Sequence, residues 1–430
     1  MRKIFFSKKR SNRVILILGA AVLIFISVIF IVVKFNEKYA SKNIIINVAK
    51  RAIAEAGALL ANFIKEKEKN TVSFGFNEHA YKNIEKIDEF MAHLESLSFN
   101  GKKIKIIKIN NPDICMAALS FQYEDFLNEN IRLLRNKYSL DKLVADISSD
   151  LEKFIILREW VRRRITEGKP KNVDYNFNAL NILERAERGE HFFCSETATV
   201  FIQCVISLGY TGRYIGLFKG HILAEVWSND FNKWVIMDVG DNLHYERFGV
   251  PLGALELHRT LEIGNFSDID VVYGIDMKHL SREESNFYIS YYHEFFTRMR
   301  NDWFSNKYPH WHPKGNSIMN SLEWQDQYTS NNILVAKEIN NSEGFNFCLN
   351  VVSIMCDKNN SSQKEIHLNF NTFTPGFSHF LLSIDDGAKL KNDSKNLTWK
   401  LHQGINMIQV SAVNVLGVSG PLSEVELVIE

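Results

Sequence analysis

One predicted helix, apolar around most of its circumference, constrains this chain more than any other stretch. Gly209 ends it, and glycine is the commonest residue at a helix stop. Cys194 opens it. Between them the apolar residues fall in two rows at helical spacing, Ala198, Phe201, Ile202, Val205 and Ile206, then Val200, Cys204 and Leu208. Because both rows need burial, we expect this helix to lie inside a core.

Two strands are expected after the helix. His221–Trp227 alternates between apolar and mixed faces, and a turn over 228–233 leads to the strand Trp234–Asp238. If Trp227 pairs with Trp234, Leu223 lies opposite Asp238 and His221 is its diagonal neighbour. A slip of two residues puts His221 directly opposite Asp238. Either register leaves an imidazole and a carboxylate on one face within side-chain reach.

Cys194, His221 and Asp238 are the residue types that a nucleophile, its base and an orienting carboxylate require. A thiol at a helix N-terminus lies where unpaired N–H groups and the helix dipole favour the thiolate. Cys204 lies on the same helix, about 15 Å away by helical rise, which is beyond disulfide reach. We therefore predict that Cys194 is a free thiol and the catalytic nucleophile.

Three blocks in this order resemble the transglutaminase-like superfamily, the relatives of the papain-type cysteine proteases. They are Cys194-Ser-Glu-Thr-Ala, His221-Ile-Leu-Ala-Glu-Val-Trp227 and Trp234-Val-Ile-Met-Asp238. The resemblance covers roughly residues 150–250. It implies an α+β core in which the helix that carries the cysteine packs on an antiparallel sheet, with Cys194 as nucleophile, His221 as base and Asp238 as orienter. The segment before the cysteine lacks the expected glycines, which leaves the oxyanion donor other than the Cys194 N–H unassigned.

Residues 14–33 form an uncharged apolar run of about twenty residues, enough for a helix to span the hydrocarbon core of a bilayer. It is too long for the apolar region of a cleavable signal peptide. Basic residues crowd the segment before it: Arg2, Lys3, Lys8, Lys9, Arg10 and Arg13. The positive-inside rule then predicts a cytoplasmic tail at 1–13, one transmembrane anchor at 14–33, and a body on the periplasmic or extracellular side.

The remaining chain is expected to form four parts. An N-terminal α/β region spans 34–144, the transglutaminase-like core 145–265, an aromatic-rich helical extension 266–335, and an all-β sandwich of the fibronectin III or immunoglobulin type 340–430. Short β-like runs separated by turn signals predict the sandwich. Because a sandwich should own its core, we expect a chain that ends near Asn340 to stay folded. Cys348 and Cys356, on one expected strand of the sandwich, are too far apart to bridge.

Aromatic residues concentrate between the core and the sandwich. We expect a core helix at Tyr288–Arg300. Trp311 lies in a proline-flanked loop. Trp311 and Trp227 are candidates for the wall of a substrate cleft, but for Trp311 the favoured interpretation is a loop held against the domain by its aromatic side chains. His310 and His312 form a His-x-His pair without a third ligand, so we predict no metal site, and no cofactor.

The charge balance excludes one class of partner. Lysine and arginine number 51 against 50 acidic residues, a net charge of +1, which gives no case for nucleic acid. With five cysteines in 430 residues, the chain is not a disulfide scaffold. The expected function is an exported, membrane-anchored cysteine enzyme that cleaves or exchanges an amide in a protein, a peptide or a glycan-linked substrate. The alternative is a catalytically idle relative that serves as a scaffold or binding protein in cell-envelope or surface-polysaccharide assembly.

Overall fold

The computed structural model describes residues 87–99, 101–171, 177–217, 220–264, 266–305, 321–326, 337–356 and 365–429, and of residues 337 and 338 only the backbone. The expected cytoplasmic tail, the anchor at 14–33 and Trp311 lie outside these ranges. The chain divides into two units, 1–75 and 76–430, and every described residue belongs to the second. No helix within the described ranges is long and apolar enough to cross a membrane.

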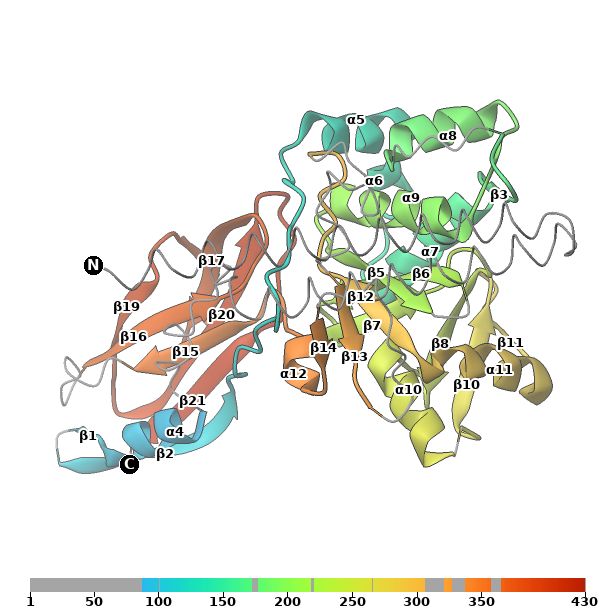
Figure 1. The fold of residues 1–430 in the computed structure, drawn as a ribbon. Coiled ribbons are helices and arrows are strands. Elements are labelled where there is room, and N and C mark those ends of the chain that lie inside the picture. The colour runs from blue at the N-terminus through green and yellow to red at the C-terminus, as the bar shows by residue number, and fades with distance from the viewer. Residues whose placement is uncertain are drawn as a thin grey trace, which may run out of the picture. The chain divides into compact units, whose positions relative to one another are not determined.

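The predicted buried helix is α9, Cys194–Ser207, in which every residue from Thr197 onward is buried. It packs on strands β5 and β6 and against helices α5, α7 and α8, of which α5 and α8 lie above it in the view of Figure 1. Their bounds are α5 Glu129–Tyr138, α6 Leu140–Leu143, α7 Asp150–Arg162 and α8 Ala179–Glu187. The expectation that this helix lies inside a core is confirmed from Thr197 onward, while Cys194 at its start is half-buried.

The sheet beneath α9 has six strands in the order β14-β13-β12-β5-β6-β7. Every pairing is antiparallel except β13 with β14. The strands are β5 Gly212–Leu217, β6 His221–Ser228, β7 Lys233–Met237, β12 Phe295–Arg298, β13 Ser321–Trp324 and β14 Lys337–Ile339. The protein is thus a mixed α/β chain with several helices on a largely antiparallel sheet.

The β6–β7 hairpin adopts the first of the two registers considered above. Trp227 pairs with Trp234 and Ala224 with Met237, which makes Asp238 the residue that follows opposite Leu223. The two tryptophans meet edge to face with ring centroids 5.8 Å apart, a favourable aromatic geometry. This pair fixes the position of Asp238 relative to His221.

A second, smaller sheet follows, in the order β11-β10-β8-β9. Its strands and the helices beside it are β8 Leu243–Arg247, β9 Val250–Pro251, β10 Ile269–Tyr273, β11 Lys278–His279, α10 Ala254–Ile263, α11 Arg282–Ile289 and the 3-10 helix η1 Ser290–His293. The parallel two-stranded pair β3 Thr166–Glu167 and β4 His191–Phe192 leads into α9.

The prediction of a helix at Tyr288–Arg300 is wrong, and so is the prediction that 266–335 is a helical extension. The helical segment ends at His293, and Phe295–Arg298 is strand β12 of the main sheet. Phe296 lies opposite Gly216 of β5, where a Cβ would collide with the Phe296 ring. An aromatic run fits a buried strand as well as a buried helix, and here the glycine opposite it provides the room for a strand.

The remaining strands form two sheets that share one hydrophobic core. Their orders are β1-β2-β21-β20-β17-β18 and β15-β16-β19. The bounds are β1 Ser98–Phe99, β2 Lys102–Asn110, β15 Val352–Cys356, β16 Glu365–Thr372, β17 Phe377–Ile384, β18 Leu390–Asn392, β19 Asn396–Lys400, β20 Gly404–Asn414 and β21 Ser423–Ile429, with α4 at Ile87–Ser96 and α12 at Ser342–Phe345. The expected C-terminal β-rich module is present.

The boundaries at 144 and 340 do not hold. Strand β2 pairs with β21 along its length, and α4 contributes Phe90 and Leu94 to the core of the C-terminal module. Residues 87–110 therefore belong to the β-rich module, although they precede the core in sequence. At the other end, the core against the sheet that contains β5 and β6 includes five residues beyond 340: Phe345, Phe347, Cys348, Leu349 and Val351.

A buried arginine explains why 345–347 belong to the sheet. Arg213 and Glu225 are fully buried and form an ion pair of 2.6 Å. The guanidinium also donates to the Phe345 carbonyl at 2.7 Å and the Asn346 side chain at 3.1 Å. Trp234 donates to the Phe347 carbonyl at 2.8 Å. A buried charged group needs a hydrogen-bond partner for each of its polar atoms, and segment 345–347 supplies acceptors for the Arg213 guanidinium.

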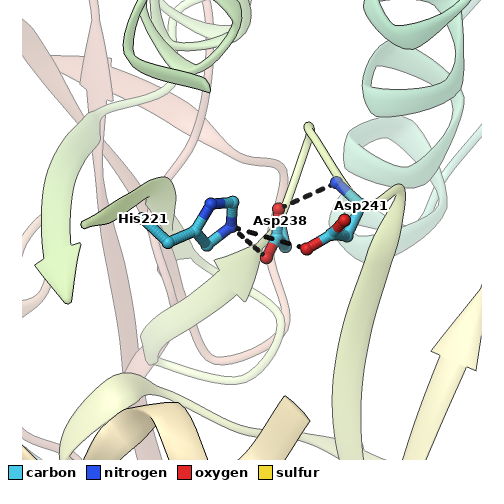
Figure 2. Close-up of side chains that lie close together, drawn as sticks. All are labelled: His221, Asp238 and Asp241. Carbon is cyan, nitrogen blue, oxygen red and sulfur yellow. Dashed lines mark hydrogen bonds and ion pairs between the residues drawn. The ribbon is translucent and has the colours of Figure 1, made fainter. Parts of the chain in front are cut away.

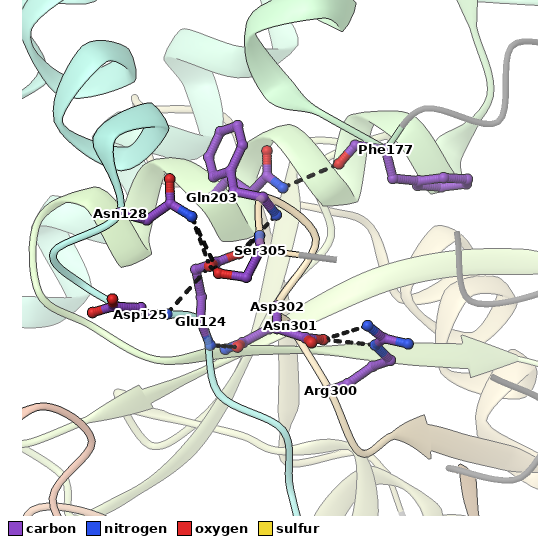
Figure 3. A network of polar contacts seen from close by, with 10 residues as sticks. Glu124, Asp125, Asn128, Phe177, Gln203, Arg300, Asn301, Asp302 and Ser305 are labelled. Atoms are coloured by element: carbon purple, nitrogen blue, oxygen red, sulfur yellow. Dashed lines mark hydrogen bonds and ion pairs between the residues drawn. The ribbon is translucent and has the colours of Figure 1, made fainter. Parts of the chain in front are cut away.

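Glu124 joins the N-terminal segment to the chain beyond β12 (Figure 3). Its carboxylate accepts from the Phe304 and Ser305 backbone N–H groups at 2.7 and 3.2 Å and from the Ser305 hydroxyl. Its own N–H donates to Asn301 at 2.8 Å, and Asn301 donates to the Gly212 carbonyl at 2.9 Å. Burial raises the pKa of Glu124, and these donors oppose that rise. The network fixes the start of β5.

Candidate active site

Cys194 is the first residue of α9 and is half-buried. Two hydrogen bonds hold the first turn of the helix in place. The Tyr214 hydroxyl donates to the Ser195 carbonyl, and the Thr199 hydroxyl donates to the same oxygen at 2.9 Å. Tyr214 is fully buried on β5. The thiol therefore belongs to a helix end whose first turn is held in place by these hydrogen bonds.

His221 opens β6 and lies between the thiol and Asp238. Its Nε2 is 2.7 Å from Asp238 Oδ2 (Figure 2). The Cys194 thiol is near enough to the ring to be among the groups that raise the His221 pKa. The Asp238 side chain is 2% exposed and that of His221 22%, so the carboxylate is enclosed while the ring reaches solvent. The structure brings together the three residues predicted from the sequence.

The electrostatics of this arrangement favour a charged imidazole. Burial lowers the pKa of His221, but the carboxylate of Asp238 and the Cys194 thiol outweigh it and raise that pKa to about 11. The imidazolium is then the resting form at neutral pH. An imidazolium in contact with a thiol stabilises the thiolate, which is the nucleophilic form.

A second carboxylate near His221 was missed by the sequence analysis. Asp241 Oδ2 lies 3.7 Å from His221 Nε2, and the Asp241 N–H donates to Asp238 Oδ1 at 3.1 Å (Figure 2). Burial and repulsion from Asp238 raise the pKa of Asp241 to about 6, against the opposing effect of His221. The Asp-x-x-Asp spacing directly after a strand is the only sequence signal that pointed to it.

The turn between Asp238 and Asp241 approaches β3 closely. A Cβ at Gly240 would collide with the Glu167 carboxylate and would lie 3.6 Å from His221 Cε1. The exposed Glu167 side chain would have to move to make room for it. Glu167, which is exposed on β3, thus lies close to the imidazole, and the mouth of the site is acidic.

Arg158 supports the same turn from within the core. This arginine of α7 is fully buried; its Nε donates to Asn242 Oδ1 at 3.1 Å and its Nη2 to the Gly274 carbonyl at 3.1 Å. Its Nη1 lies 2.9 Å from His244 Nδ1. Burial lowers the pKa of Arg158 to about 10, while the Asp238 and Glu159 carboxylates oppose this. Arg158 is a positioning residue for the turn that carries Asp238, and a lone arginine beside an apolar helix stripe gave no clear sequence signal.

Trp227 does not line a cleft, contrary to expectation. Its side chain is 2% exposed and packs against Trp234 inside the sheet's core. It also lies six residues along β6 from His221, about 20 Å at the rise of a strand. Trp311, the other candidate, lies outside the described residues.

Two groups of possible metal ligands occur among the described residues. One is His221, Asp238 and Asp241, which is the site described above. The other is His258, Glu262 and Asp326, where His258 Nε2 meets the Asp326 carboxylate and Nδ1 lies 2.8 Å from the Tyr292 carbonyl oxygen. A histidine–aspartate ion pair accounts for the second group without a metal. His310 and His312 lie outside the described ranges.

The sequence matches no protein-family model, no curated protein and no solved structure.

Proposed function

We propose that this protein is a cysteine acyl-transfer enzyme that hydrolyses an amide, with Cys194, His221 and Asp238 as its catalytic residues. One arrangement carries the proposal: His221 Nε2 lies 2.7 Å from the enclosed carboxylate of Asp238, and the Cys194 thiol that opens α9 is near enough to raise the pKa of the same ring. The sequence resemblance to the transglutaminase-like superfamily, with its papain-like fold, supports the same chemistry.

The reaction follows from the positions of these groups. The Cys194 sulfur attacks the amide carbonyl carbon and forms a C–S bond, with the Cys194 N–H close to the developing oxyanion. The His221 imidazolium gives its proton to the amide nitrogen, which leaves as an amine and produces a thioester. Water, deprotonated by neutral His221, then attacks the thioester carbonyl, and breaking of the C–S bond releases the carboxylic acid and restores the Cys194 thiolate and the His221 imidazolium. Asp238 keeps the ring oriented in both steps. Water is the favoured acceptor because hydrolysis demands no second acceptor site.

A peptide vinyl sulfone tests this proposal directly. Such a probe carries amide bonds that seat in an acyl-transfer site and an electrophile that alkylates a thiolate. We expect it to modify Cys194 stoichiometrically, and we expect His221→Ala to abolish that modification while His279→Ala, which removes an exposed histidine paired with Asp270, leaves it intact. Peptide mass spectrometry reads each cysteine separately. Modification of Cys194 at the same rate in His221→Ala would refute the enzyme and leave the scaffold function.

We further propose that the protein is anchored by residues 14–33, with its body exported. A protease added outside cells, with any outer membrane permeabilised, is expected to degrade the region 87–429 and leave only the N-terminal tail and anchor. Antibodies against the C-terminal module and against a tag before residue 14 distinguish the two fragments. Full protection of the C-terminal module, in cells whose outer membrane is permeabilised and whose cytoplasmic membrane is intact, would overturn this orientation.

A further inference from the structure

Two cysteines far apart in the sequence lie side by side in the fold. Cys115 is in the segment between β2 and α5, and Cys348 follows α12. The Cys348 N–H donates to the Cys115 carbonyl at 2.9 Å, and the Cys115 N–H donates to Cys348 Sγ at 2.7 Å. A further bond joins the same two segments, because the Ala118 N–H donates to the Gly344 carbonyl at 2.9 Å. The two backbones are thus held in register at the cysteine pair.

The Cys348 side chain contacts Cys115 directly, because the Cys348 thiol also donates to the Cys115 carbonyl at 3.4 Å. Each thiol also shifts the pKa of the other. Neither is engaged in a disulfide, and the same holds for the other three cysteines. Cys204 is fully buried in α9, and Cys356 is buried in β15 opposite Leu368. Of the five cysteines, these two therefore form a built pair, which the sequence analysis did not consider.

The two thiols differ in the way that thiol–disulfide exchange requires. Cys115 is half-buried, whereas Cys348 is 8% exposed. The neighbouring Cys348 thiol lowers the pKa of Cys115, whereas Cys115 together with burial raises the pKa of Cys348. An accessible thiol of low pKa is the attacking group in such exchange, and a buried neighbour resolves the intermediate.

We propose that Cys115 and Cys348 are a disulfide-forming pair, which an oxidising disulfide converts into an intramolecular bond. The Cys115 thiolate attacks one sulfur of the oxidant, forms a mixed disulfide and releases the first thiol. The Cys348 thiol, losing its proton, then attacks the Cys115 sulfur and releases the second. The two protein thiols together lose two electrons and two protons, and the oxidising disulfide takes them up to become two thiols.

The bond would act on the part of the fold that supports the sheet. Cys348 directly follows the segment 345–347 that satisfies Arg213 and Trp234, and Cys115 belongs to the arm that leads from β2 of the C-terminal module. A covalent link across 233 sequence positions restricts the unfolded chain strongly. The pair therefore serves as a covalent clasp that ties the arm from β2 to segment 345–348 within the core against the main sheet, and its formation does not depend on the proposed reaction of Cys194.

The test uses the full chain in detergent, with Cys194→Ser to keep the reactive thiol out of exchange. Reduced protein is incubated with oxidised glutathione, denatured, alkylated and digested. We expect a disulfide-linked peptide pair containing Cys115 and Cys348, and an increase in Tm on the order of 5 °C that dithiothreitol reverses. Adding Cys356→Ser should leave both results unchanged, whereas adding Cys115→Ser should abolish both.

Two outcomes would overturn the proposal. One is full alkylation of Cys115 and Cys348 after oxidation. The other is recovery of glutathione adducts on Cys115 without the linked peptide, which would show that Cys348 does not reach the intermediate. If Cys115→Ser does not fold, the peptide map of the Cys194→Ser protein still decides between these results.

Discussion

Replacing His221 by alanine is expected to slow the alkylation of Cys194 at about pH 6 roughly a hundredfold. The imidazolium that pairs with the thiol in the native protein, with a pKa raised to about 11 by Asp238 and Cys194 despite burial, is then gone. A thiol without a cationic partner is almost wholly protonated at this pH. The measurement is the rate of iodoacetamide labelling at each cysteine as a function of pH, read by mass spectrometry.

The two aspartates near His221 provide a matched comparison for the same experiment. Asp238 is enclosed and 2.7 Å from Nε2, whereas Asp241 is 40% exposed and 3.7 Å away. Asp238→Asn should reduce turnover by on the order of a thousandfold, because the imidazole loses its orientation. The pKa of Asp241 is raised to about 6, so the carboxyl is largely neutral below that pH and charged above it. Asp241→Asn should therefore change labelling above about pH 7 and leave it unchanged near pH 5.

An ordinary thiol titration of Cys194 that is the same in wild type and His221→Ala would contradict the catalytic assignment. So would equal effects of Asp238→Asn and Asp241→Asn at every pH. The labelling of Cys115 in the same digests serves as an internal reference, because His221 is not among the groups that influence it.

A chain that ends at Asn340 is expected to lose its cooperative fold, contrary to the expectation from sequence. The truncation removes the carbonyls and the side chain that satisfy Arg213 and Trp234. Leaving one side of a buried charge network unsatisfied costs about 3–5 kcal/mol, and the loss of Phe345 and Phe347 from the core adds a similar amount for each. The sum of these losses is comparable with the free energy of unfolding of a whole domain, which is about 5–15 kcal/mol.

Point variants separate this explanation from a general effect of truncation. Phe345 is fully buried and Phe287 is 57% exposed, so Phe345→Ala should lower the free energy of unfolding by about 3–5 kcal/mol and Phe287→Ala by less than about 0.5 kcal/mol. Urea unfolding followed by near-ultraviolet circular dichroism gives both values. A cooperative transition in the chain that ends at Asn340 would show that the sheet does not need 345–347.

The sequence contained enough local information to predict the buried helix, the hairpin and the three residues of the site. The apolar rows of α9 report burial directly, because a helix exposes each face at a fixed spacing. The alternation of β6 and the Trp227–Trp234 pair define which residues share a face, and a hairpin with a short turn has few registers. Cys194, His221 and Asp238 follow from these local patterns.

Only the tertiary structure decided the features that depend on partners distant in the chain. The aromatic residues of β12 were compatible with helix or strand until Gly216 lay opposite Phe296. Strand β2 joins β21 across almost the whole described chain, and Arg158, Asp241 and Glu167 reach the site from separate elements. Cys115 and Cys348 meet across 233 positions. Periodicity tells which face of an element is buried, but not which other element covers it, because that choice is made by the packing and hydrogen bonding of all the elements together.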